Sequence, residues 1–277
     1  MTPPRLIAGL RDVASDHDAF LVDQFGVLHD GTAPYPGAVD TLLALRDAGK
    51  LVIVLSNSGK RAAQNATRLE RLGFPSDAWT QVLTSGEVAW SILAEAPQSR
   101  RRCLLLARDG DRSAIGGLPI DLADGGGDCD VVLIAASEGD RWSLADYEVL
   151  LAPAAARRVP AYCTNPDRHM LTPVGLRFGA GQVAELYERL GGMVSWIGKP
   201  YPEIYAAARR LLGDVAPARI LCVGDSVEHD VAGAAGAGLA SCLVRSGIHV
   251  DADDTALAAL YDATGATPQF LAPAFRW

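Results

Sequence analysis

Residues 19–31 read AFLVDQFGVLHDG, and this stretch decides the fold class. Four apolar residues lead directly into an acid, Asp23, and Gly26 follows where the chain can turn. A short apolar run without polar alternation is typical of a strand buried on both faces, as in a parallel sheet covered by helices. We therefore interpret residues 19–23 as a strand that presents the Asp23 carboxylate at the end of a sheet.

Further apolar runs of the same kind alternate with amphipathic segments of helical period. This alternation predicts an α/β fold whose core is a Rossmann-like, doubly wound parallel sheet. The predicted strands are LVIVLS (51–56), RCLLLA (102–107), DVVLIAA (130–136) and RILCVGD (219–225), and the predicted helices lie in 36–50, 62–74, 202–213 and 231–238.

The chain of 277 residues is long for one domain and comfortable for two. Its middle segment carries strands of its own, a Gly-rich stretch and the helix-like GQVAELYERLGG, with core-like patterns on both sides. We expect a core domain formed by residues 1–82 and 194–277 and an inserted α/β cap domain formed by residues 83–193.

Composition indicates which classes of binding partner and which cellular compartment to expect. The formal net charge is -8 and no dense Lys/Arg cluster is present, so we expect no nucleic-acid partner. The five cysteines are odd in number and lack a C-x-x-C spacing, which favours a reducing cytoplasm over a disulfide framework or a zinc site. No run approaches the roughly 20 apolar residues of a membrane helix, so we expect no membrane partner.

Acids end two of the predicted core strands. Asp23 ends the first, and GDSVEHD (224–230) supplies Asp225 at the end of another and Asp230 five residues later. The carboxyl ends of parallel strands meet at one edge of the sheet. Ionised carboxylates gathered there repel one another unless a cation neutralises them, and hard oxygen ligands without His or Cys indicate Mg²⁺.

Two further motifs carry groups that suit an oxyanion. Ser56 and Asn57 end the second strand, where hydroxyl, amide and backbone N–H groups suit phosphate. Lys199, in IGKPYPEIY, precedes a predicted helix and can hold both a phosphate and a nucleophile. Taken singly, these residues are ordinary: a turn, an exposed lysine and, for Asp230, a helix cap. Their conjunction in this order is what points to a site.

With these motifs the chain resembles the haloacid dehalogenase superfamily, class IIA. Its four motifs correspond to Asp23 in DQFGVLHDG, Ser56 in VIVLSNS, Lys199 in GKPYPEIY, and Asp225 with Asp230 in GDSVEHDVAGAAGAG. The resemblance implies a cap inserted between the second and third motifs. It also implies a Mg²⁺-dependent phosphatase that acts on a small phosphorylated metabolite through an aspartyl-phosphate.

The resemblance also implies a role for each motif residue. Asp23 would attack phosphorus, and Mg²⁺ would be bound by Asp23, the backbone carbonyl of Phe25 and Asp225, with Asp230 completing the metal site. Lys199 would take part in catalysis.

Substrate contacts would come from the second motif and the cap. Ser56 and Asn57 would bind the phosphoryl oxygens. CTNPD (163–167) resembles the cap of this class, and its Asn165 and Asp167 would face the leaving group. Caps of class IIA relatives commonly contribute to homodimers, so a homodimer is among the assemblies that the resemblance implies.

One position departs from the family pattern. Phosphatases of this family usually carry a second Asp two residues after the nucleophile, where it protonates the leaving alcohol and later activates water; here that residue is Phe25. A phenyl ring cannot transfer a proton, and positioned acid/base catalysis contributes about 10²–10⁴-fold in rate.

Three explanations of Phe25 stay open at this stage. His29, close along the loop, could act as the acid, since its ordinary pKa near 6.5 suits the task. The leaving group could depart without a proton, as from an acyl phosphate or a carbon–halogen bond, although the intact GDSVEHD weighs against dehalogenation. The chain could also bind a phosphorylated ligand with little or no turnover.

Overall fold

The computed structural model describes residues 3–95, 102–172 and 175–277, and the chain divides into two compact units. The first unit consists of three segments, Met1–Ser56, Ala63–Leu83 and Lys199–Trp277. The second consists of Asn57–Ala62 and Thr84–Gly198. A core assembled from both ends of the chain, with an insertion between them, is therefore the organisation of this protein.

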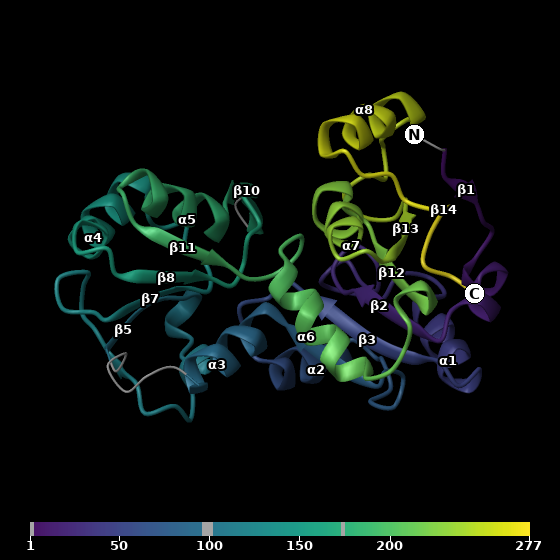
Figure 1. Ribbon diagram of the computed structural model, residues 1–277, viewed down its shortest axis with the longest axis horizontal. Coiled ribbons are helices and arrows are strands. Elements are labelled where there is room, and N and C mark those ends of the chain that lie inside the picture. The colour runs from purple at the N-terminus through teal and green to yellow at the C-terminus, as the bar shows by residue number, and fades with distance from the viewer. Residues whose placement is uncertain (1–2, 96–101, 173–174) are drawn as a thin grey trace. The chain divides into compact units, whose positions relative to one another are not determined.

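The first unit is built on a seven-stranded sheet with the order β1-β14-β13-β12-β2-β3-β4. At its centre β2 pairs in parallel with β12 on one side and β3 on the other, so segments from the two ends of the chain lie side by side (Figure 1). The strands are β1 (Arg5–Leu6), β2 (Ala19–Asp23), β3 (Leu51–Ser56), β4 (Gln81–Thr84), β12 (Ile220–Gly224), β13 (Ala240–Val244) and β14 (Phe270–Ala272).

The central strands are buried on both faces, which is the physical reason for their continuous apolar runs. Phe20, Leu21 and Val22 in β2 are at most 1% exposed. Fully burying one such side chain stabilises the fold by about 1.5–3 kcal/mol. The predicted α/β class with a parallel core sheet is confirmed.

Helices connect these strands and cover the sheet. In the first of them Ala38, Leu42 and Leu45 share one buried face, and Gly49 follows its end with a φ of 70°. Left-handed backbone of this kind favours glycine after a helix. The helices of this unit are α1 (Ala38–Asp47), α2 (Ala62–Arg71), α6 (Pro202–Leu212), α7 (Ala232–Gly236) and α8 (Asp254–Thr264).

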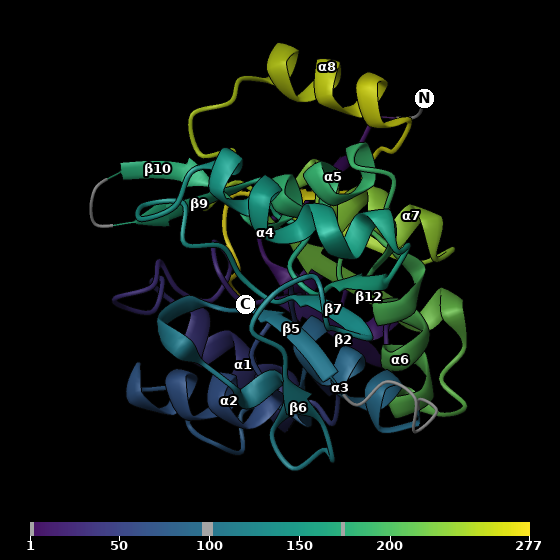
Figure 2. The same ribbon diagram turned by 90° about the vertical axis from the view of Figure 1, so that its left-hand side faces the viewer.

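The second unit has a five-stranded sheet with the order β11-β8-β7-β5-β6, and each of its four strand pairs is parallel. Helices α4 and α5 lie together over one face of this sheet (Figure 2). The elements are β5 (Arg102–Leu106), β6 (Asp121–Leu122), β7 (Val131–Ile134), β8 (Pro160–Cys163), β11 (Met193–Trp196), the antiparallel hairpin β9 (His169–Thr172) and β10 (Gly175–Phe178), α3 (Ser85–Glu95), α4 (Leu144–Ala156) and α5 (Ala180–Arg189).

The expected end of the cap at residue 193 falls inside β11 and is corrected by the structure. β11 pairs with β8 along its whole length, so residues 194–198 belong to the second unit together with residues 57–62. The run MVSW has only four residues and is interrupted by the polar Ser195, so the sequence does not mark it as a strand. A strand must pair to satisfy its backbone groups, and among the strands of the described residues β11 pairs with β8.

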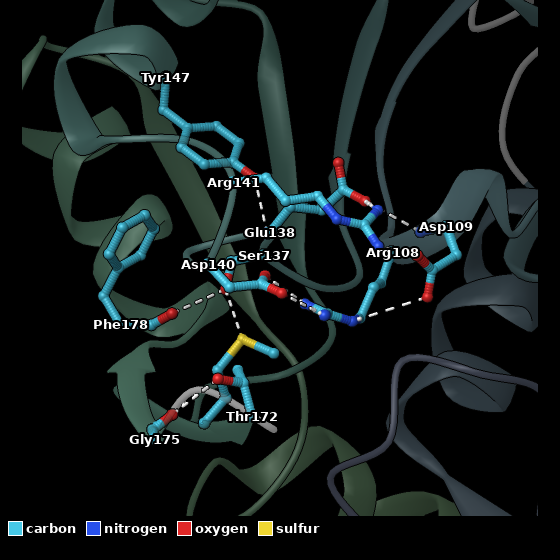
Figure 3. A network of polar contacts seen from close by, with 11 residues as sticks. Arg108, Asp109, Ser137, Glu138, Asp140, Arg141, Tyr147, Thr172, Gly175 and Phe178 are labelled. Carbon is cyan, nitrogen blue, oxygen red and sulfur yellow. Dashed lines mark hydrogen bonds and ion pairs between the residues drawn. The ribbon is translucent and has the colours of Figure 1, made fainter.

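A polar network joins two loops and a hairpin of the second unit (Figure 3). Arg108 donates two hydrogen bonds to Asp140, at 2.7 and 2.6 Å. The buried Ser137 hydroxyl donates to the Phe178 carbonyl at 2.8 Å, and Glu138 N–H donates to the Tyr147 hydroxyl at 2.9 Å. The loops after β5 and β7 are thereby tied to each other and to the end of the β9–β10 hairpin.

Two general features of the chain are also visible. No helix within residues 3–95, 102–172 and 175–277 combines the length and the apolar character needed to cross a bilayer. All five cysteines are buried free thiols.

Candidate active site

Three acids from separate segments meet at one edge of the central sheet. Asp23 ends β2, Asp225 directly follows the adjacent β12, and Asp230 lies in the π-helical turn Val227–Val231. One carboxylate oxygen of each lies within 4.8 Å of the others. Because β2 and β12 are parallel neighbours, their carboxyl ends necessarily bring Asp23 and Asp225 to the same edge.

Lys199 joins two of these acids. Its Nζ donates to Oδ1 of Asp23 at 2.5 Å and to Oδ1 of Asp230 at 2.7 Å. The other Asp230 oxygen, Oδ2, accepts the Ser226 N–H at 3.1 Å. Asp230 is not the cap of the following helix: the N-cap of α7 is Val231, which makes no side-chain cap. Asp230 therefore holds the Lys199 ammonium in place.

Glycines at this edge leave room for the carboxylates. A methyl group added to Gly26 or to Gly247 would stand 2.0 Å from Oδ2 of Asp225, closer than any side chain can approach. Both glycines also have positive φ, of 89° and 104°. The same Asp225 oxygen accepts the Ile248 N–H at 2.8 Å, so the loop after β13 fixes this carboxylate.

Burial and mutual repulsion shift the ionisation of the cluster. Burial raises the pKa of Asp23 well above its ordinary value, Lys199 opposes this shift, and Asp230 and Asp225 add to it. Burial followed by the Asp230 charge raises the pKa of Asp225 to about 7. Burial alone would lower the pKa of Lys199, but Asp23 and Asp230 outweigh it and raise that pKa, so the ammonium stays charged.

The donor set of this cluster fits a divalent cation. Three carboxylates and one ammonium leave a formal charge of -2 at a buried position. Within the described part of the chain, the Phe25 carbonyl oxygen accepts no hydrogen bond, so it is available beside Asp23. Carboxylate and carbonyl oxygens are the ligands that Mg²⁺ prefers, and a divalent charge would offset the repulsion among the acids.

The loop after β2 holds the phenyl ring of Phe25 at the surface, where 52% of the residue is exposed. The loop is closed by hydrogen bonds from Gly26 N–H to the His29 carbonyl at 3.0 Å and from Leu28 N–H to the Gln24 carbonyl at 2.9 Å. Leu28 is fully buried and anchors the loop. An exposed phenyl ring on so well fixed a loop is a defined surface feature of this edge.

His29 is buried, and both of its ring nitrogens have partners. Nδ1 accepts the Gly31 N–H at 2.9 Å, which leaves the proton of the neutral ring on Nε2. Nε2 lies 3.2 Å from the Gln24 amide, whose other atom, Oε1, is buried without a partner; turning the amide over supplies the matching acceptor. Burial, with a smaller contribution from Arg68, lowers the pKa of His29 to about 4. This geometry suits a residue that positions the loop and argues against the expected acid.

The remaining predicted residues divide between the two units. Ser56 ends β3, next to β2, in the first unit. Asn57, Asn165 and Asp167 lie in the second, where Asn57 Nδ2 donates to Asp167 Oδ1 at 3.0 Å and Asp167 N–H donates to Asn165 Oδ1 at 3.1 Å. Three residues proposed for substrate binding thus form one hydrogen-bonded group, although Asn57 and Asp167 are 110 positions apart.

Sequence reasoning missed the residues that position the acids. The Gly247–Ile248 loop follows β13, and no pattern in SGIHV connects it with Asp225, more than twenty residues away. Gln24 was quoted in the first motif without a role, and the structure shows it buried against His29. The sequence offers only the Ser-Gly pair at 246–247, which is typical of a turn and carries no sign of contact with Asp225.

Known protein families and relatives match most of the chain. A model described as haloacid dehalogenase-like hydrolase matches residues 20–118, and one described as HAD-hydrolase-like matches residues 196–273. Chronophin of Rattus norvegicus is 30% identical over 251 residues, 87% of this chain and 80% of the relative. D-glycerol 3-phosphate phosphatase of Mycobacterium tuberculosis is 30% identical over 246 residues, 87% of this chain but only 66% of the relative, about two thirds of its length.

Solved structures show the same fold. A hydrolase of the haloacid dehalogenase-like family from Brucella suis 1330 superposes with a TM-score of 0.83 at 29% identity, covering 97% of this chain and 99% of that one. A glycerol phosphate phosphatase from Mycobacterium tuberculosis in complex with magnesium gives 0.72 at 26% identity, covering 94% of this chain and 76% of that one. This chain therefore belongs to the haloacid dehalogenase-like hydrolases and is an enzyme of that family.

Proposed function

We propose that this hydrolase removes phosphate from a small phosphorylated metabolite, with Asp23 as the nucleophile and Mg²⁺ as the cofactor. The observation that carries the proposal is the meeting of Asp23, Asp225 and Asp230 within 4.8 Å, with Lys199 bound to two of them. The phosphatase names of the matched relatives and the magnesium complex of one of them support it.

Lys199 orients the Asp23 carboxylate for its attack on phosphorus. The ammonium holds Oδ1 at 2.5 Å, and Oδ2 is then the oxygen that would attack phosphorus. The P–O bond to the leaving group would break with its electron pair on the departing oxygen, giving an aspartyl-phosphate. Attack of water on that phosphorus would return the electron pair to Asp23 and release hydrogen phosphate and a proton.

Asp23, Asp225 and the Phe25 carbonyl would hold the cation. Asp230 already has one protein donor on each oxygen and would contribute its charge while bracing Lys199. The bound ion would neutralise the two anions that must approach each other, the Asp23 carboxylate and the phosphate. A carbonyl ligand comes from the backbone, so replacement of the usual acid by Phe25 leaves this part of the site intact.

Ser56 and Lys199 would stabilise the charge on the equatorial phosphoryl oxygens, together with Asn57. Asp167 is an acceptor and carries the same charge as phosphate, so it suits the hydroxyl or amine groups of a leaving group. Asn165 accepts the Asp167 N–H and would fix that residue.

The presence of Phe25 restricts the leaving groups to those that can depart without being protonated. A residue without an acidic proton at this position cannot protonate a departing alkoxide, and the pKa of about 4 leaves His29 uncharged at neutral pH. Leaving groups that depart as stable anions, such as the carboxylate of an acyl phosphate or a phenolate, avoid the need for an acid. Their hydrolysis is the form of the activity that the site supports best.

Phosphate release from a panel of alkyl, aryl and acyl phosphates, measured with and without Mg²⁺, tests the proposal. We expect release to require Mg²⁺ and to fall at least about 10³-fold in Asp23→Asn, because the nucleophile is lost. Asp40→Asn removes an exposed acid on α1 and serves as the matched control with unchanged release. Ligand binding without release of phosphate from any substrate would instead identify a binding protein.

A further inference from the structure

An exposed aromatic ring and an exposed guanidinium lie beside each other on the rim of this site. Both lie close to Gly31, which has a φ of 100°: a methyl group added there would stand 3.1 Å from Cε2 of Phe25 and 3.5 Å from Nη2 of Arg68. Nη2 of Arg68 also donates to the Gly31 carbonyl at 3.3 Å. The phenyl ring and the guanidinium are therefore neighbours beside one glycine.

Arg68 is a cation without an acidic partner. It lies on the exposed side of α2, and among the described residues no carboxylate is within ion-pair distance of it. Arg61, just before the same helix, differs in having both sides of its fork taken by Glu87, at 2.7 and 2.8 Å. A guanidinium presents a planar fork that matches a carboxylate or phosphate, and the fork of Arg68 has only one long bond, to a carbonyl.

The phenyl ring belongs to the loop that leaves Asp23 and borders the acid cluster. Phe25 lies two residues after Asp23, and a methyl group added to its neighbour Gly26 would stand 2.0 Å from Oδ2 of Asp225. The ring of His29 meets that of Phe25 edge-on, with centroids 5.9 Å apart, and keeps it in position. The ring is therefore held on the loop that begins at Asp23, and Arg68 lies next to it at Gly31.

We infer that Phe25 and Arg68 form a leaving-group subsite for phosphorylated aromatic acids, and this inference rests on the proposed function. The aromatic part of the leaving group packs on Phe25 next to the scissile P–O bond. An anionic substituent beyond it pairs with Arg68. The bond breaks with its electron pair on the aryl oxygen, which departs as a phenolate, so no proton is required from position 25.

Matched probes test the subsite: 4-carboxyphenyl phosphate and phenyl phosphate share the ring and differ by the carboxylate. We expect the Mg²⁺-loaded wild type to prefer the carboxylated ester about 10-fold in kcat/KM, the size of one charge-assisted hydrogen bond. Arg68→Gln should abolish this preference while leaving phenyl phosphate within about twofold. Arg71→Gln, on the last turn of α2, is the matched control and should keep the preference.

Phe25→Leu separates the two halves of the subsite. It should lower kcat/KM for both aryl esters about three- to tenfold, as expected for the loss of an aromatic pair, and leave the carboxylate preference unchanged. A wild type with equal activity on both esters, or a preference that survives Arg68→Gln, would overturn the subsite while phosphate release upholds the phosphatase. Release from neither ester nor any other phosphate would overturn both.

Discussion

At position 25 a phenyl ring stands two residues after Asp23, the nucleophile that we propose, and on that proposal this single side chain restricts the leaving groups that the site can serve. The backbone of Phe25 keeps its carbonyl oxygen free of hydrogen bonds from the described residues, while its side chain carries no proton to transfer. One residue thus separates two functions that the usual acid combines, cation binding and proton transfer.

Restoring the acid should restore proton transfer. We expect Phe25→Asp to raise kcat for alkyl phosphates, whose alkoxides need a proton, by about 10²-fold or more. Phe25→Asn has nearly the same shape without an acidic proton and should not produce the increase. Equal rates for the two variants with Mg²⁺ still bound, measured as phosphate release, would contradict this account of position 25.

Burial of a neutral His29 should make the fold sensitive to mild acid. Its pKa is about 4 in the folded protein and near 6.5 in the unfolded chain, so the unfolded state binds the additional proton between these values. Stability is complete above pH 6.5 and falls as the pH drops toward 4, by about 2 kcal/mol after allowance for solvent screening. Urea unfolding at pH 7 and pH 4.5 checks this, and His29→Gln should flatten the difference.

Among the elements, those with a continuous apolar run were predicted within one or two residues. β2 and β3 are found at their predicted bounds, and β12 is one residue shorter at each end, because strands buried on both faces leave no polar interruption. Several other strands were missed, among them β8, β11 and β13. β11 has only four residues and contains the polar Ser195, and ASCLV in β13 begins with Ala and Ser rather than with a continuous apolar run.

The loops of the second unit depend on the ion pair between Arg108 and Asp140. Arg108 holds the pKa of Asp140 at about 2, below its ordinary value, so the pair contributes stability above pH 4 that is lost as the pH falls toward 2. We expect Arg108→Gln to lower Tm at pH 7, with a smaller difference from wild type near pH 2. Arg112→Gln, which alters an exposed neighbour, is the control, and an equal loss of Tm at both pH values would count against the ion pair.

At the scale of the whole molecule, the three carboxylates of the site place an excess of negative charge inside the first unit. Its acids come from the two ends of the chain, and burial raises the pKa of Asp23 and Asp225 in the absence of a cation. The free energy of folding and the binding of a divalent ion are therefore linked.

Mg²⁺ should stabilise the protein against unfolding. Loss of one acid should weaken this stabilisation, but it should make the metal-free protein more stable. At 100 times its Kd the ion adds about 2.7 kcal/mol to the free energy of unfolding. Asp225→Asn should remove most of this gain and, in EDTA, should raise Tm, because it relieves repulsion with Asp230. Thermal unfolding of both proteins with and without Mg²⁺ measures this, and an undiminished Mg²⁺ shift in the variant would exclude Asp225 as a ligand.

The sequence by itself determined the α/β class, the central strands and the acids at their ends, because burial on both faces and the meeting of parallel strand ends are properties of local pattern. Only the tertiary structure decided that Asp230 holds Lys199, that His29 is enclosed, and that Gly247 and Ile248 fix Asp225. It likewise placed the uncompensated Arg68 against the glycine that adjoins Phe25. These contacts join residues that no periodicity connects, and their strength depends on burial and distance, which exist only once the chain has folded.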